Sequence, residues 1–289
     1  MAKTKADRPL SATMAAVLLE VMTGVSLIAV LATTTFPAQP ASRIDWGVVA
    51  IPAAAAVLFG VCAFAVLKGL SWARFASAIV LGVAGLFGCE LMVGIVALGA
   101  SFAGGDWILL AIAVCVAVPP FVAVVAAVVL ISMPSGDDWY RAIGPGAQSR
   151  GSPGWFGPTA LCMLLLAVGV GVYSRYAQYV ANGAHLPPGS RPPASLVQTL
   201  FTGGGLLLVT LVAAVFMARR CEAGRFFTVV AGAAAFMYPV ATVGTTSPAP
   251  ELFGVWHIAV WVLSAAAVLM VTRFDFDQTI HSGSSSASV

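Results

Sequence analysis

Charged residues are scarce in this 289-residue chain, where Asp, Glu, Lys and Arg together make up 9% of the positions. A soluble domain carries about 25% charged residues, because its surface must be wetted. Hydrophobic residues reach 60%, and the mean hydropathy is +0.98. The shortage of charge excludes a soluble globular protein and predicts an integral membrane protein, whose first partner is the lipid bilayer. The net charge of +3 comes without a basic stripe, so nucleic acid is not an expected partner.

The sequence also lacks the motifs of common enzymes and metal sites. No pair of its five cysteines has CxxC spacing, so neither a disulfide framework nor a zinc site is predicted. The HExxH, GxSxG and P-loop patterns are absent. We therefore expect no enzymatic activity, no cofactor and no bound metal. A third-ranked alternative is a metal-dependent enzyme, in which the acidic pairs Asp137–Asp138 and Asp275–Asp277 hold a divalent cation at the cytoplasmic face.

Long apolar runs take the place of those motifs. A helix crosses the hydrocarbon core of a bilayer in about 20 residues. Runs near this length predict eight transmembrane helices, at residues 14–34, 47–68, 75–99, 107–132, 157–174, 195–217, 226–244 and 251–272. The first run follows a short basic segment, as in a signal peptide, but its length favours an uncleaved helix. The predicted fold is an all-α integral membrane protein with eight transmembrane helices.

The basic residues predict the orientation of these helices. With eight spans both termini lie on one side, and an inside N-terminus places 11 of the 14 Lys and Arg residues in the cytoplasm. Only Arg43, Arg175 and Arg191 are then outside. Cytoplasmic loops carry an excess of Lys and Arg, so both termini are predicted to be cytoplasmic. The chain has eleven Arg against three Lys and is rich in Ala and Gly, a bias typical of a high-GC bacterium, so we expect the bacterial inner membrane.

One long polar break, at residues 133–155, separates two similar halves. The segment LKGLSWARFASAIV at 67–80 aligns with ARRCEAGRFFTVVA at 218–231, which pairs Arg74 with Arg225. An even number of spans in each half gives both copies the same orientation, so the repeat is predicted to be parallel. The predicted divisions are a first four-helix half at 1–133, a cytoplasmic linker at 134–156, a second four-helix half at 157–273 and a disordered cytoplasmic tail at 274–289.

Three ionisable residues interrupt the apolar runs: Glu20 in the first, Glu90 in the third and His257 in the eighth. A carboxylate at the bilayer centre costs roughly 2.5–3.5 kcal/mol, so we expect both carboxyl groups to face protein or water. His257 lies at a depth close to that of Glu90 and is the best candidate for its polar partner. These residues form a candidate intramembrane site for a proton, a cation or a polar contact between helices.

Pro119 and Pro120 lie together in the middle of the fourth predicted span. They remove two backbone donors and free the carbonyl groups of Cys115 and Val116. Broken helices at this depth often mark binding sites, although neighbouring helices can also repair a simple kink. The pair predicts a helix break, and both readings of it remain open.

The low content of polar residues favours some functions of a membrane protein over others. A carrier or pump usually has more polar lining, so the first interpretation is a non-enzymatic accessory or structural subunit of an inner-membrane assembly, with other membrane subunits as partners. The alternative is a small-solute or proton-coupled transporter that uses Glu20 and Glu90. A water-filled cavity reaching either carboxyl would favour transport, whereas a sealed bundle would favour the accessory role.

Overall fold

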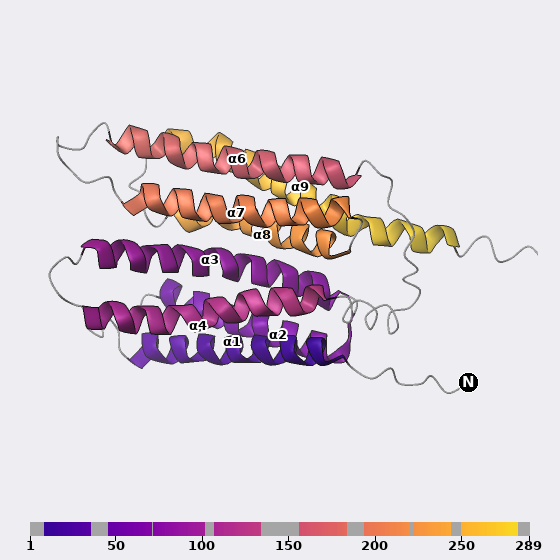
Figure 1. Ribbon diagram of the computed structural model, residues 1–289, viewed down its shortest axis with the longest axis horizontal. Coiled ribbons are helices and arrows are strands. Elements are labelled where there is room, and N and C mark those ends of the chain that lie inside the picture. The colour runs from indigo at the N-terminus through magenta and orange to yellow at the C-terminus, as the bar shows by residue number, and fades with distance from the viewer. Residues whose placement is uncertain are drawn as a thin grey trace, which may run out of the picture. The chain divides into compact units, whose positions relative to one another are not determined.

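The computed structural model describes residues 9–35, 46–70, 72–101, 107–133, 156–183, 194–219, 222–243 and 250–282. These residues form helices and no strand, so the predicted all-α class is confirmed for this part of the chain (Figure 1). The helices are α1 (Leu10–Thr35), α2 (Trp46–Lys68), α3 (Ala73–Ser101), α4 (Trp107–Ser132), α6 (Phe156–Gly183), α7 (Ala194–Ala218), α8 (Glu222–Val243) and α9 (Pro250–Ser282).

Each helix begins within four residues of a predicted apolar run, but two helices end much later than predicted. α6 continues past residue 174 to Gly183, and α9 continues past residue 272 to Ser282. The second extension takes in residues 274–282, which the sequence assigned to a disordered tail. In both cases the polar residues that closed the apolar run do not stop the helix.

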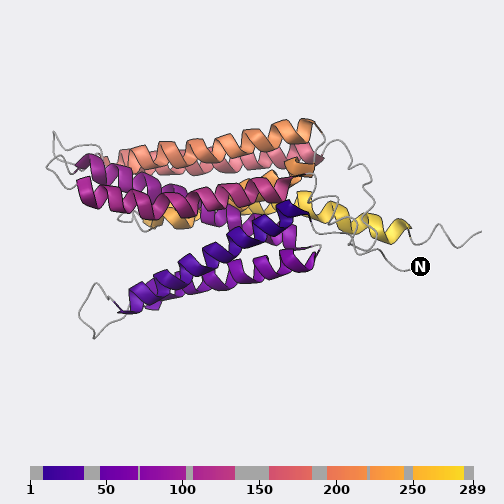
Figure 2. The same ribbon diagram turned by 60° about the horizontal axis from the view of Figure 1, so that its bottom comes forward.

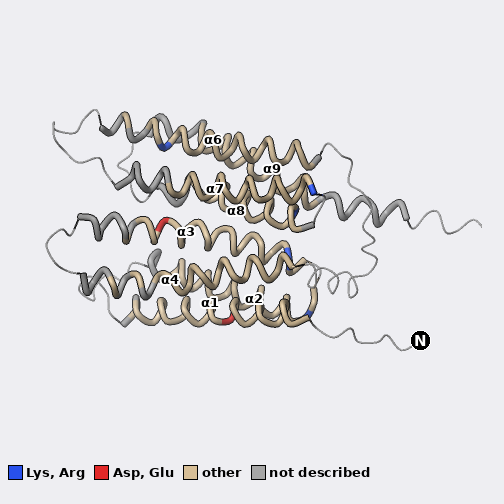
Figure 3. Tube along the Cα trace, viewed as in Figure 1, with Lys and Arg blue, Asp and Glu red and all other residues tan. Residues whose placement is uncertain are grey.

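Five helices are long and apolar enough to cross a membrane, namely α1, α2, α3, α6 and α7. In α4 and α9 the apolar segments found are shorter, at Ala117–Ser132 and Trp256–Thr272. Figure 3 shows the charged residues as isolated positions along otherwise uncharged helices. The chain is therefore a helical, multi-pass membrane protein, and the count of eight spans stays a prediction.

The chain divides into two compact units that share α3 and α4. Unit 1 comprises residues 1–81 and 122–146, and unit 2 comprises residues 82–121 and 147–289. In unit 1, α1 packs along α2; in unit 2, α6 packs against α7, α8 and α9, and α8 also packs against α7 and α9 (Figures 1 and 2). Arg74 and Arg225, the anchors of the predicted repeat, lie in the first turns of α3 and α8. The repeat itself stays a prediction.

α4 runs without interruption through Pro119 and Pro120. The predicted helix break is therefore not a gap in the helix. Each proline removes only the hydrogen bond that its own ring blocks, and the turns on either side keep theirs. The boundary between the two units nevertheless falls one residue after Pro120, between Phe121 and Val122.

Small residues let α8 pack closely inside unit 2. Residues 228–235 of this helix are all buried, and most of them are Ala, Gly or Val. A Cβ added to Gly232 would collide with the Val268 side chain of α9, and one added to Gly82 of α3 would collide with the Val230 carbonyl. Small side chains allow such close helix contacts in membranes, so α3, α8 and α9 position the residues described next.

Candidate functional site

An ion pair is buried inside unit 2 between α3 and α6. Arg175 Nη1 donates a hydrogen bond to Glu90 Oε1 at 3.0 Å, and each side chain is only 8% exposed. At about 1.5 Å per residue, Glu90 lies about 16 Å before the end of α3 and Arg175 about 12 Å before the end of α6. Each charge offsets part of the desolvation of the other, which is the usual condition for a buried charge.

Tyr238 of α8 extends this pair into a cluster of three residues. The Arg175 guanidinium carbon lies 4.6 Å from the centroid of the Tyr238 ring, a cation–π contact. The Tyr238 side chain is 1% exposed and therefore cannot move aside easily. One turn before Arg175, a Cβ added to Gly171 would lie 3.0 Å from Tyr238 Cδ1. The glycine thus makes room for the ring against α6, on the helix face that carries Arg175.

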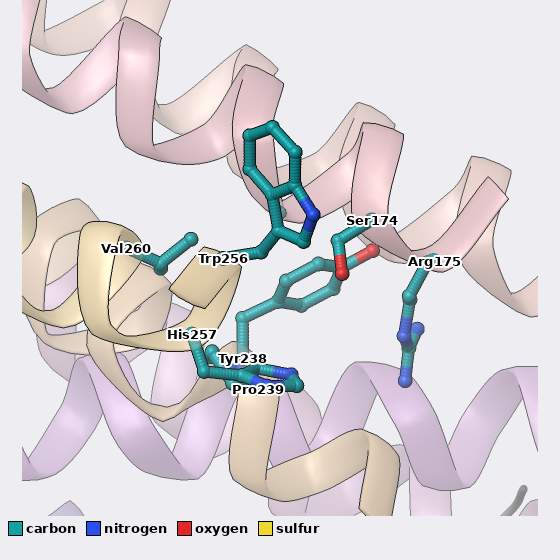
Figure 4. A pocket seen from close by; sticks show the side chains of 8 residues that line it. Ser174, Arg175, Tyr238, Pro239, Trp256, His257 and Val260 are labelled. Carbon is teal, nitrogen blue, oxygen red and sulfur yellow. The ribbon is translucent and has the colours of Figure 1, made fainter. Parts of the chain in front are cut away.

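A small cavity lies beside the cluster (Figure 4). Its lining residues are Gly171, Ser174, Arg175, Tyr238, Pro239, Trp256, His257 and Val260. The space open to the centre of a water-sized sphere is about 10 Å³, roughly what one water molecule requires. The buried Tyr238 hydroxyl has no hydrogen-bond partner among the described residues, and Figure 4 shows it on the side of Ser174 and Arg175. The cavity is therefore too small for a solute larger than water.

The predicted site residues are not all brought together. Glu90 and His257 belong to unit 2, and His257 is buried beside the cavity, with its ring centroid 6.4 Å from that of Trp261. Arg175 takes the ion-pair position on Glu90 for which the sequence favoured His257. A further contact between Glu90 and His257 stays a prediction. Glu20 lies in unit 1, on an exposed part of α1, so it is not part of this cluster.

Arg175 and Tyr238 were missed by the sequence reasoning. The polar stretch SRYAQY led to a predicted span end at residue 174, which placed Arg175 outside the membrane. The available signal was the absence of Gly and Pro between Gly171 and Gly183, which lets the helix continue. For Tyr238 no sequence pattern separates it from the other aromatic residues of an apolar helix.

Metal binding receives no support within the described residues, where no group of three His, Cys, Asp or Glu side chains is placed to hold an ion. The predicted acidic pairs fall elsewhere. Asp137 and Asp138 lie outside the described residues, as do the side chains of Asp275 and Asp277. The metal-dependent enzyme therefore stays a prediction, because the side chains that would hold its metal lie outside the described residues.

We expect Gly171→Ala to lower the free energy of unfolding by about 1–3 kcal/mol, the usual range for overpacking. The new methyl group meets the Tyr238 ring, which is held between Arg175 and its buried surroundings. Detergent-induced unfolding followed by tryptophan fluorescence would measure the loss. Gly169→Ala is the matched control, because an added Cβ there meets nothing within 4 Å. Equal stability of the two variants would contradict the packing argument.

Comparisons of the chain with protein-family models, with curated proteins and with solved structures give no match. Any functional conclusion therefore comes from the chain itself, and above all from the buried cluster of Glu90, Arg175 and Tyr238.

Proposed function

We propose that this chain is a non-enzymatic accessory or structural subunit of a bacterial inner-membrane assembly. Its eight spans form two parallel four-helix repeats, and both termini lie in the cytoplasm. In this role the few intramembrane polar groups hold helices together and contact other subunits, and they do not move a substrate.

The Glu90–Arg175 ion pair is the observation that carries the proposal. A carboxylate that takes up a proton or cation during transport must exchange partners in each cycle. Glu90 is instead bonded at 3.0 Å to a guanidinium, a group that keeps its charge at every physiological pH. The neighbouring cavity has room for about one water, which is too little for a solute path. Polar side chains that join transmembrane helices commonly serve this holding role.

A proton-coupled transporter is the second candidate, and one feature favours it. Ser174, Tyr238 and His257 place two hydroxyl groups and an imidazole around the cavity beside Arg175. Such groups can pass a proton when a water molecule joins them. In this alternative Glu90 would act as the proton acceptor after it leaves Arg175, and Glu20 would act at a separate point in unit 1.

Proton flux into vesicles separates the two candidates. The purified chain is reconstituted with a pH-sensitive dye inside the vesicles, and a proton gradient is imposed. The accessory role predicts no flux above that of protein-free vesicles. It also predicts that the Glu90→Leu/Arg175→Leu double variant migrates with the same native assembly as the unaltered chain in mild detergent. Flux through the unaltered chain that disappears in the double variant would reject the accessory role.

A reporter fused after Val289 tests the proposed topology. Eleven of the 14 basic residues fall on the N-terminal side of the membrane in the eight-span arrangement, so the C-terminal fusion is expected in the cytoplasm. A fluorescent protein that folds only in the cytoplasm should therefore be bright. Alkaline phosphatase, which needs the periplasm, should be inactive at the same position. The reverse result would contradict the proposed topology, through either an odd number of spans or an inverted orientation with both termini outside.

A further inference from the structure

Glu20 occupies an unusual place in the first helix. α1 buries one side, which includes Ala12, Ala16 and Leu19, and packs along α2. Glu20 is exposed, about 15 Å from the start of α1 and about 22 Å from its end. It has no hydrogen bond or ion pair among the described residues. A carboxyl group so far from either helix end is too short to reach the headgroups, unlike a Lys or Arg side chain.

The residues around Glu20 resemble a helix-packing surface on which no described part of unit 1 is packed. Helical spacing places Val17, Gly24, Leu27 and Leu31 on the same side of α1 as Glu20. The three apolar side chains are 50%, 51% and 61% exposed, in chain order. A Cβ added to Gly24 would meet nothing within 4 Å. Glycine in a transmembrane helix permits close approach of a second helix, and no described residue of unit 1 makes that approach. These five residues are called the Glu20 face.

Among the residues whose side chains the structure describes, no cation is available for this face. Lys68, Arg74, Arg219 and Arg225 lie at or within a few residues of helix ends, far from mid-membrane depth. Arg175 lies within the apolar span Gly157–Ala177, and it is buried against Glu90 in unit 2. A second copy of the chain would bring another carboxyl to the same depth instead of a cation. For the described side chains, charge complementarity therefore favours a different polypeptide.

We propose that the Glu20 face binds a transmembrane helix of a partner subunit, which presents a Lys or Arg at the depth of Glu20 and packs against Gly24. This inference rests on the accessory role proposed above and names the chemistry of the partner. The cation removes the penalty of a lipid-facing carboxylate, and the glycine lets the two backbones come close enough for the ion pair to form. Polar groups in hydrocarbon gain most from such direct pairing, because no water competes for them.

Association with synthetic helices tests the proposal. The full chain, labelled at its C-terminus with a donor dye, is reconstituted with acceptor-labelled Leu-rich helices that match the 23-residue span of α1. The central residue of the probe helix is Arg, Gln or Leu. Energy transfer should show the Arg helix binding roughly 3- to 15-fold more strongly than the Leu helix, the range expected for a polar contact between membrane helices. The Gln helix should bind less strongly than the Arg helix.

Two variants connect the binding to the face. Glu20→Leu should reduce binding of the Arg helix to the level of the Leu helix. Gly24→Leu should weaken binding of the Arg helix while leaving the Glu20 charge in place. Gly204→Leu is the matched control, because Gly204 of α7 is an exposed glycine and, as at Gly24, its added Cβ meets nothing within 4 Å. This control should bind like the unaltered chain.

Three outcomes would overturn the proposal: equal binding of all probe helices, unchanged binding by Glu20→Leu, or self-association of the chain that depends on Glu20. The result is separable from the proton-flux experiment, which depends on Glu90 and Arg175. A chain without flux that also ignores the Arg helix would keep the accessory role and lose only the Glu20 partner. A chain that shows flux and also binds the Arg helix would lose the accessory role and keep the Glu20 partner.

Discussion

Arg175→Leu is expected to lower the free energy of unfolding by about 3–5 kcal/mol, the usual loss when one partner of a buried ion pair is removed. Glu90 would then be 8% exposed, inside an apolar helix, without the guanidinium that balances its charge. The same change removes the cation–π contact with Tyr238. Stability can be measured by titration with a denaturing detergent in mixed micelles, with the tryptophan residues as probes.

The double variant Glu90→Leu/Arg175→Leu should be close to the unaltered chain in stability. Two leucines leave no buried charge, and replacement of a buried ion pair by apolar side chains is often neutral or stabilising. Glu90→Leu alone should cost less than Arg175→Leu, since the remaining guanidinium keeps its contact with Tyr238 and can extend toward the headgroups. A double variant as unstable as Arg175→Leu would show that the pair does not act as a unit.

The helices were predictable because the physics that makes them is local to each segment. A run of apolar residues with the length of a bilayer core must form a helix to satisfy its backbone. Every described helix accordingly begins close to a predicted run. Helix ends were less predictable, as α6 and α9 show. Polar residues end the apolar run but do not by themselves end the helix, since α6 continues through Ser174 and Arg175.

The candidate site was predictable only in part, for a related reason. Glu90 was identified because the cost of a carboxyl in an apolar run can be read from one segment. The identity of its partner depends on which helices touch and how each is rotated. That rotation is set by close contacts such as Gly171 against Tyr238, which link residues 67 positions apart in the sequence. The exposure of Glu20 was also unexpected, because the sequence gives no sign of which side of α1 packs on α2.

Gly82→Ala is expected to cause a second large loss of stability, comparable to that of Arg175→Leu. The added methyl group would collide with the backbone carbonyl of Val230 in α8, which cannot rotate away as a side chain can. Val229 and Ala231 beside it are fully buried, so α8 has little room to shift. α3 must therefore move away from α8, and this movement also strains the Glu90–Arg175 contact further along α3. Overpacking alone costs about 1–3 kcal/mol, and loss of the ion pair would add to it.

Unfolding in mixed micelles measures this loss, with Gly204→Ala as the matched control. Gly204 is also helical, but its added Cβ meets nothing within 4 Å. Alanine favours a helix by about 1 kcal/mol over glycine, so the control should be unchanged or slightly more stable. If collision with Val230 is the cause, Gly82→Ser should destabilise the chain at least as much as Gly82→Ala, because its side chain is larger. A Gly82→Ala variant as stable as the control would mean that α3 and α8 do not make this close contact in the membrane.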